Sequence, residues 1–217
     1  MLRFAEEILL LALDDETGRL LPLPDRALDF ALAGAVLAEL LFRGKLRIEE
    51  ERVVRVQTAP PKDPVLREGL ALIPGKEEGT PLQEILTRLA GHGSHFRDNT
   101  FQTLEEKGIL RCKDDRFLWV FHLRRYPILD DREEKEVRRR IRDVILREEN
   151  PGPRDVILVA LMDVCQLSYT VFTEEELERV GERIHHVARM DFLGRAMAQA
   201  INQIQRAILQ IRAYSGI

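Results

Sequence analysis

The residues best suited by type and spacing to bind a charged ligand are basic side chains beside a glycine-rich break. His95 and Arg97 follow the sequence Gly91-His92-Gly93, and Arg124 and Arg125 form a second basic pair. Guanidinium and imidazolium groups donate charge-assisted hydrogen bonds to phosphate oxygens. By residue type these side chains could contact an anionic group, but their spacing in the sequence assigns them no site.

Patterns of catalysis and of metal binding are missing from the sequence. No glycine-rich phosphate loop follows a predicted strand, and no Gly-x-Ser-x-Gly elbow is present. His185 and His186 are adjacent, so on a helix they diverge by about 100° and cannot chelate one metal ion together. Cys112 and Cys165 stand alone, which argues against a zinc site or a disulfide framework. We expect no metal, no cofactor and no enzymatic activity.

A run of aromatic residues suggests a surface for association. Phe117, Trp119 and Phe121 alternate along a predicted strand and therefore share one face of it. The opposite face of the run is also largely apolar, and a two-stranded hairpin is marginally stable alone. Either both faces are buried within the monomer, or one face contacts a second subunit, another protein or lipid.

Composition limits the possible partners. The chain has 217 residues, 45% of them hydrophobic and 32% charged, which is typical of a soluble globular protein. Its net charge of −4 provides no global basic field for nucleic acid or anionic lipid, so such binding needs a local patch. The apolar run from Ile8 to Leu13 is too short to span a membrane, and we expect a cytoplasmic protein.

Two similar sequence motifs, at residues 39–46 and 104–110, indicate how the basic and aromatic residues are positioned. Each predicted helix ends at a glycine, Gly44 or Gly108, and is followed directly by strand-like sequence. We expect hairpins near 45–57 and 109–123, the second with its turn at Asp114-Asp115.

The rest of the chain reads as helix. The expected helices cover residues 2–13, 26–43, 65–73, 82–90, 97–107, 132–149, 154–168, 174–190 and 193–212. Helices 26–43 and 154–168 are apolar nearly all round and should form the core. Asp25 should cap the first of these, and Thr173 with Glu176 forms a capping box. We place Glu6-Glu7 on the solvent side of the first helix.

The helix over 132–149 carries the strongest run of positive charge. Its arginines lie among acidic residues at helical spacing, as in the pairs Glu134–Arg138 and Glu136–Arg140. We expect a solvated face, with a phosphate- or membrane-binding face as the alternative.

The order of these motifs resembles the Golgi phosphoprotein 3 family in a short, prokaryotic-type form. The resemblance rests on residues 6–18, on Leu32-Ala33-Gly34 followed by Arg43-Gly44, on residues 104–110, and on Arg154-Asp155. It implies a mainly α-helical single domain over 1–217: a buried helical bundle surrounded by amphipathic helices, with two small β-hairpins, one used in oligomerisation. It also implies phosphatidylinositol 4-phosphate binding and interaction with cytoplasmic tails of glycosyltransferases.

In the family that the chain resembles, the lipid pocket contains a tryptophan and several arginines. The tryptophan falls at Pro24, and the arginine before the helix glycine falls at Ala33. Of the paired arginines near the second motif, the first falls at Ser94 and the second at Arg97, with His95 beside it. The resemblance thus implies a lipid headgroup site that retains Arg97 and His95.

Three functions follow as hypotheses. The first is a peripheral, adaptor-like protein on the cytoplasmic face of a membrane, at the Golgi in a eukaryotic host. It would bind anionic lipid through Arg97 with His95 or through Arg124-Arg125, assisted by the hairpin. The second is a soluble homo-oligomeric interaction module joined through Phe117, Trp119 and Phe121. The third is a winged-helix-like nucleic-acid binder, which Glu105-Glu106 on the presumed recognition helix would oppose.

Overall fold

The protein is mainly α-helical, as its sequence predicts. The computed structural model describes residues 2–117, 121–147 and 150–188, together with Arg206, Leu209, Gln210 and Ala213. Within this part the α-helices are α1 (Phe4–Leu11), α2 (Ala27–Phe42), α3 (Pro64–Leu72), α4 (Leu82–Ala90), α5 (Gly93–Glu106), α6 (Arg132–Leu146), α7 (Pro153–Val164) and α8 (Glu174–Ala188), with a short 3₁₀ helix, η1 (Leu167–Thr170). The helix expected over 193–212 lies largely outside the described residues.

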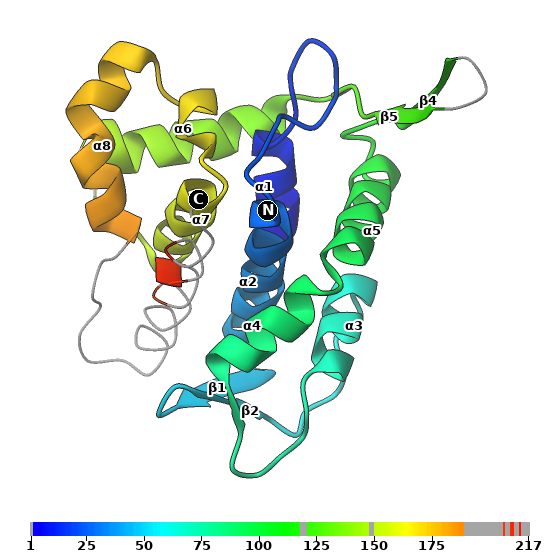
Figure 1. The fold of residues 1–217 in the computed structure, drawn as a ribbon, viewed down its shortest axis with the longest axis vertical. Helices are drawn as coiled ribbons and strands as arrows, with labels where there is room; N and C mark the ends of the chain where they lie inside the picture. Colours follow the sequence, from blue (N-terminus) through cyan, green and yellow to red (C-terminus); the bar gives the residue numbers. More distant parts are fainter. Residues whose placement is uncertain are drawn as a thin grey trace.

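The central layer consists of α1, α2 and α7, which pack against one another (Figure 1). Helix α2 also contacts α3, α4 and α5, so other helices cover it on several sides. Small residues such as Ala31, Ala33 and Gly34 let these neighbours approach closely. Helices α2 and α7 are therefore the two core helices that the sequence predicts. The described helices share one hydrophobic core, whereas the assignment of a single domain over 1–217 stays a prediction.

Helices α2 and α5 end in the same way, as the two similar sequence motifs predict. Gly44 has φ +62° and Gly108 has φ +71°, a left-handed conformation that favours glycine. The residue after each glycine reaches back across the helix end: Lys45 N donates to Leu40 O at 2.9 Å, and Ile109 N donates to Leu104 O at 3.0 Å. These 6→1 bonds are the mark of a Schellman cap, and they turn the chain into the strand region that follows.

The first hairpin gains a third strand. β1 (Leu46–Glu49) pairs with β2 (Arg52–Arg55), and β2 pairs with β3 (Thr80–Pro81), all antiparallel. Thr80 pairs with Val53, and the helix that follows begins at Leu82, as predicted.

The second hairpin is present in a register different from the prediction. β4 (Lys113–Phe117) pairs with β5 (Phe121–Arg125), so the strands are joined after Phe117 and not at Asp114-Asp115. The reason lies at the start of the segment, where Ile109 and Leu110 are buried. They anchor the chain to the body, since Leu110 forms a bridge with Ile128. The paired strands begin only after this anchor.

Of the predicted helix starts, some are confirmed and others are wrong. Thr173 and Glu176 form the expected capping box, with Thr173 N donating to Glu176 Oε2 at 3.0 Å and Glu176 N donating to Thr173 Oγ1 at 3.3 Å. Asp25 is not the cap of α2. Arg26 occupies that position with φ +59°, and it makes no side-chain capping bond. Helix α5 starts at Gly93, earlier than expected, so the glycine-rich break is confined to Gly91-His92.

The prediction that Glu6-Glu7 faces solvent is wrong. The two side chains are 0% and 1% exposed because α1 is enclosed by α2, α5, α6 and α7. Glu6 accepts bonds from Arg3 at 2.6 Å and from Lys107 Nζ at 2.7 Å. Burial works to raise the pKa of Glu6, but these hydrogen bonds outweigh it and hold the pKa below its usual value.

Glu7 lies at the centre of a second group of buried ion pairs. It accepts hydrogen bonds from Arg140 at 2.8 Å and from Arg154 at 3.3 Å. Here burial dominates and raises the pKa of Glu7 despite both arginines. Arg154 also reaches Glu39 at 3.4 Å and lies 4.0 Å from the centre of the Phe4 ring. These contacts connect α1, α2, α6 and α7.

The basic run of α6 is therefore only partly a solvated face. Arg138 bonds to Glu134 as predicted, at 2.6 Å from Nε. Arg140, however, points inward to Glu7 and to Asp155, with 19% of its side chain exposed. Helical spacing alone pairs Arg140 with Glu136, but α1 and α7 supply the carboxylates that it contacts.

Candidate functional site

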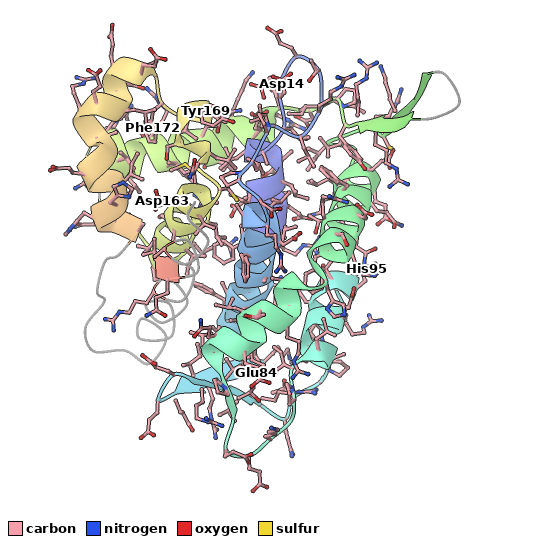
Figure 2. All side chains as sticks on the ribbon, in the orientation of Figure 1. Asp14, Glu84, His95, Asp163, Tyr169 and Phe172 are labelled. Carbon is pink, nitrogen blue, oxygen red and sulfur yellow. The ribbon has the colours of Figure 1, made fainter. Side chains whose placement is uncertain are left out.

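The two predicted headgroup residues lie on α5 and face different neighbours. Arg97 Nε donates to Asp98 Oδ1 at 3.1 Å, whereas His95 Nε2 lies 3.2 Å from Glu68 Oε2 of α3. Residues two apart on a helix differ by about 200° in direction, which explains the separation. Figure 2 shows His95 on α5 near α3. A shared role for the two residues in one site stays a prediction.

Arg124 from β5 approaches the same carboxylate that Arg97 contacts. The guanidinium of Arg124 hydrogen-bonds to Tyr126, and this bond, together with the negative charge of Asp98, raises the pKa of Arg124. The ring of Tyr126 stacks on Phe101 of α5, with centroids 3.8 Å apart and planes within 6°. The foot of the hairpin, where Arg124 and Tyr126 lie, is thereby fixed against α5. Arg97 bonds to Asp98, and Arg124 lies close enough to feel the charge of the same carboxylate.

In the sequence, the hairpin has two parts. Its stem, residues 113–116 and 122–125, is mostly charged, and its tip, residues 117–121, is apolar. The register places Lys113 opposite Arg125, and Phe117 opposite Phe121. The hairpin projects from the body beside the upper end of α5 (Figure 1). Trp119 and the side chains of Phe117 and Phe121 lie outside the described residues, so their proposed contacts stay predictions.

A carboxylate of α2, Asp29, lies against the start of α5. A Cβ added at Gly93 would be only 2.7 Å from Cα and Cβ of Asp29 on α2. Asp29 Oδ2 is also 3.9 Å from Nε of Arg26, whose guanidinium lies 5.2 Å from the centre of the Phe30 ring. The junction of α2 and α5 thus carries its own negative charge.

The three other positions that the resemblance assigns to a pocket supply no cation here. Pro24 lies in the loop before α2, Ala33 is fully buried in the core, and Ser94 is exposed in the first turn of α5. Ala33 is packed among hydrophobic side chains, which leaves no opening to solvent at that point. Of the four positions that the resemblance assigns to the pocket, Arg97 is therefore the one with a cationic side chain.

Sequence reasoning missed the residues that complete this region. Asp98 contacts Arg97, Tyr126 contacts Arg124, and Asp29 lies against Gly93 at the start of α5; no motif marks these three residues. The Tyr126-Pro127 dipeptide signals a turn, and only the fold shows that the tyrosine ring stacks on α5.

Other side chains that could bind a metal ion or react are dispersed over the fold. Among the described residues, no cluster of three or more histidine, cysteine, aspartate or glutamate side chains could hold a metal ion. His185 Nδ1 lies 3.4 Å from Asp163 Oδ1, and Cys165 is buried, which raises the pKa of its thiol to about 12. In the same part of the chain, no helix is long and apolar enough to cross a membrane.

Comparison with known proteins identifies the class to which this fold belongs. The sequence model of the Golgi phosphoprotein 3 (GPP34) family matches residues 4–204, nearly the whole chain. The chain is a member of the Golgi phosphoprotein 3 family.

Two fungal proteins share part of this sequence. Vacuolar protein sorting-associated protein 74 of Eremothecium gossypii is 27% identical over 178 residues, which cover 72% of the chain and 51% of that protein. The protein of the same name from Schizosaccharomyces pombe is 28% identical over 164 residues, covering 66% of the chain and 48% of that protein. The chain thus spans about half the length of the curated relatives it matches.

Proposed function

We propose that this protein is a peripheral, adaptor-like membrane protein that binds anionic lipid through the foot and tip of the β4–β5 hairpin. The observation that carries the proposal is the position of two arginines where the hairpin leaves the body: Arg97 bonds to Asp98 at 3.1 Å, and Arg124 bonds to Tyr126, which stacks on α5. Membership of the Golgi phosphoprotein 3 family supports it. The membrane would be met from its cytoplasmic face, and at the Golgi in a eukaryotic host.

The two parts of the hairpin suit the two layers of a membrane surface. Basic residues near an anionic surface gain about 1 kcal/mol each, which matches the stem and foot. Large aromatic side chains favour the interface between headgroups and acyl chains, which matches the tip sequence Phe117-Leu118-Trp119-Val120-Phe121. Neither part is strong alone, so we expect reversible binding that needs both.

The lipid preference should be broad. A phosphoinositide headgroup carries several negative charges, and a dedicated pocket needs several cations. Pro24, Ala33 and Ser94 supply none, and Asp29 adds a negative charge at the same junction. We therefore expect a general anionic surface to bind about as well as phosphatidylinositol 4-phosphate at equal surface charge.

Asp29 should weaken anion binding at this junction, and removing its charge should strengthen it. We expect Asp29→Asn to bind anionic vesicles about fivefold more tightly, because one repulsive charge is worth about 1 kcal/mol near such a surface. Vesicle titration of the variant and of Glu84→Gln, on α4, checks this. Equal affinity of Asp29→Asn and the parent would show that Asp29 does not face the lipid.

The apolar tip should be needed for membrane binding. We expect Trp119→Ser with Phe121→Ser to lose most vesicle binding, since the tip would no longer enter the interface, while the mass in solution stays unchanged. Vesicle sedimentation and light scattering measure the two properties. A smaller mass with intact vesicle binding would instead favour the alternative, a homo-oligomer joined through the hairpin.

The nucleic-acid alternative also stays a prediction. Glu105 Oε1 accepts a bond from Cys112 N at 2.8 Å, so this acidic residue lies at the junction of helix and hairpin. In a winged helix the same junction would approach the phosphates of the duplex, where a carboxylate is unfavourable.

A further inference from the structure

A groove with basic residues lies at the opposite end of the molecule from the β4–β5 hairpin. It has a volume of about 880 Å³ and runs between the end of β2, with the chain that continues from it, and the loop after α3. In Figure 1 the sheet with β1 and β2 lies at the lower end of the long axis and the hairpin at the upper end. The groove is therefore remote from the proposed lipid-binding face.

One wall of the groove is an open strand edge. On its β1 side the chain is paired, since Val54 lies opposite Arg47, and Val56 N donates to Lys45 O at 2.9 Å. On its other side β3 pairs only with Arg52 and Val53. Alternation along a strand then directs the backbone groups of residues 55 and 57 into the groove. Outside the β1–β2–β3 ladder, these groups make no backbone hydrogen bond within the described part of the chain.

Hydrogen bonds on the β1 side hold this edge in its extended conformation. Lys45 Nζ donates to Thr58 Oγ1 at 3.2 Å and to Ala59 O at 2.9 Å. These bonds fix the chain after β2 against the β1 side. The groove side is left open, so a ligand would meet an edge that is already ordered.

The groove has an excess of positive charge. Arg47, Arg55 and Lys76 line it, and Glu77 is the carboxylate among its lining residues. Arg47 is engaged by Glu49 at 2.8 Å. Arg55 Nη1 donates to the carbonyl of Ile73 at 3.3 Å, which keeps its charge beside the groove without a carboxylate partner there.

We propose that this groove binds an acidic peptide segment in extended conformation, which adds as a strand beside residues 55–57. The open backbone edge suits a polypeptide, because only another backbone supplies donors and acceptors at strand spacing. The cations select acidic side chains on that peptide. An adaptor would then hold the membrane at one end and an acidic protein segment at the other.

The test uses the full chain and a fluorescein-labelled eight-residue peptide of alternating Glu and Val. We expect measurable binding by anisotropy, no binding of the peptide with Gln for Glu, and about tenfold weaker binding by Lys76→Glu. Arg179→Glu on α8 makes the same change of charge on an exposed helix and should bind as the parent does.

Two forms of the peptide, N-methylated at even or at odd positions, test strand addition. Only one set of amides faces the protein in a strand, so one form should lose binding and the other should retain it. Equal binding of both forms, equal loss in Lys76→Glu and Arg179→Glu, or binding of the Gln peptide would each overturn the proposal. Because these outcomes do not involve vesicles, they are independent of the proposed lipid binding.

Discussion

Replacing Arg154 by methionine will lower the free energy of unfolding by about 3–5 kcal/mol, the cost of leaving a buried charge without its partner. Arg154 bonds to Glu7, to Glu39 and to the carbonyl of Leu2, and it lies over the Phe4 ring. Methionine fills much of the same space, so the loss is mainly electrostatic. Urea or thermal unfolding measures it, and a decrease in Tm of about 10 °C is expected.

Neutralising Glu7 in the same background should restore part of the lost stability. In Arg154→Met, Arg140 is the one partner that Glu7 keeps among the described residues, and Glu7 is 1% exposed. The double variant Glu7→Gln with Arg154→Met removes the stranded charge, while Arg140 keeps its 2.8 Å bond to Asp155. The double variant should therefore be more stable than Arg154→Met alone.

The stability of Arg154→Met should also depend on pH in a defined direction. Burial already raises the pKa of Glu7, and losing Arg154 raises it further. The folded variant then binds a proton more readily than the unfolded chain, so its stability decreases as pH rises through the raised pKa. Arg147→Met is the control and should cost less than about 1 kcal/mol, because Arg147 is exposed and its partner Asp143 keeps its 2.7 Å bond to Arg139. A similar small cost for Arg154→Met would contradict the structural role of the cluster.

The second large effect concerns the proposed lipid-binding face. Arg97→Glu or Arg124→Glu will each weaken binding to anionic vesicles by about 2 kcal/mol, roughly 30-fold, because an attraction is replaced by a repulsion of similar size. Arg97→Glu also places a second acidic residue next to Asp98, which strengthens the repulsion. Arg179→Glu should leave vesicle binding unchanged, and circular dichroism checks that all variants are folded. Equal binding by Arg97→Glu and the parent would remove Arg97 from the site.

The elements with strong local signals could be predicted from the sequence. The glycines that end α2 and α5, and the capping box at Thr173, act within a few residues, so their patterns are visible in the chain. Helices α2 and α7 are also recognisable because continuous apolar sequence has only the interior in which to lie.

The errors arose where distant segments decide the outcome. Helical periodicity places Glu6-Glu7 toward water. Lys107, Arg140 and Arg154 arrive from three other segments and, with Arg3 at the start of the same helix, make burial possible. The strand register failed for a related reason, since Leu110 pairs with Ile128 before the hairpin begins. In the site, Arg97 could be found from its sequence motif, whereas the position of Arg124 beside α5 depends on the packing of Tyr126 against that helix.

The most direct test of the proposed function is co-sedimentation of the full chain with three kinds of vesicle. The vesicles are neutral, generically anionic, or contain phosphatidylinositol 4-phosphate at matched surface charge. We predict that the protein sediments with both anionic kinds to a similar extent, stays in solution with neutral vesicles, and loses sedimentation in Arg97→Glu. Absence of sedimentation with all three would contradict membrane binding and would favour a soluble oligomeric module with the fold of the family.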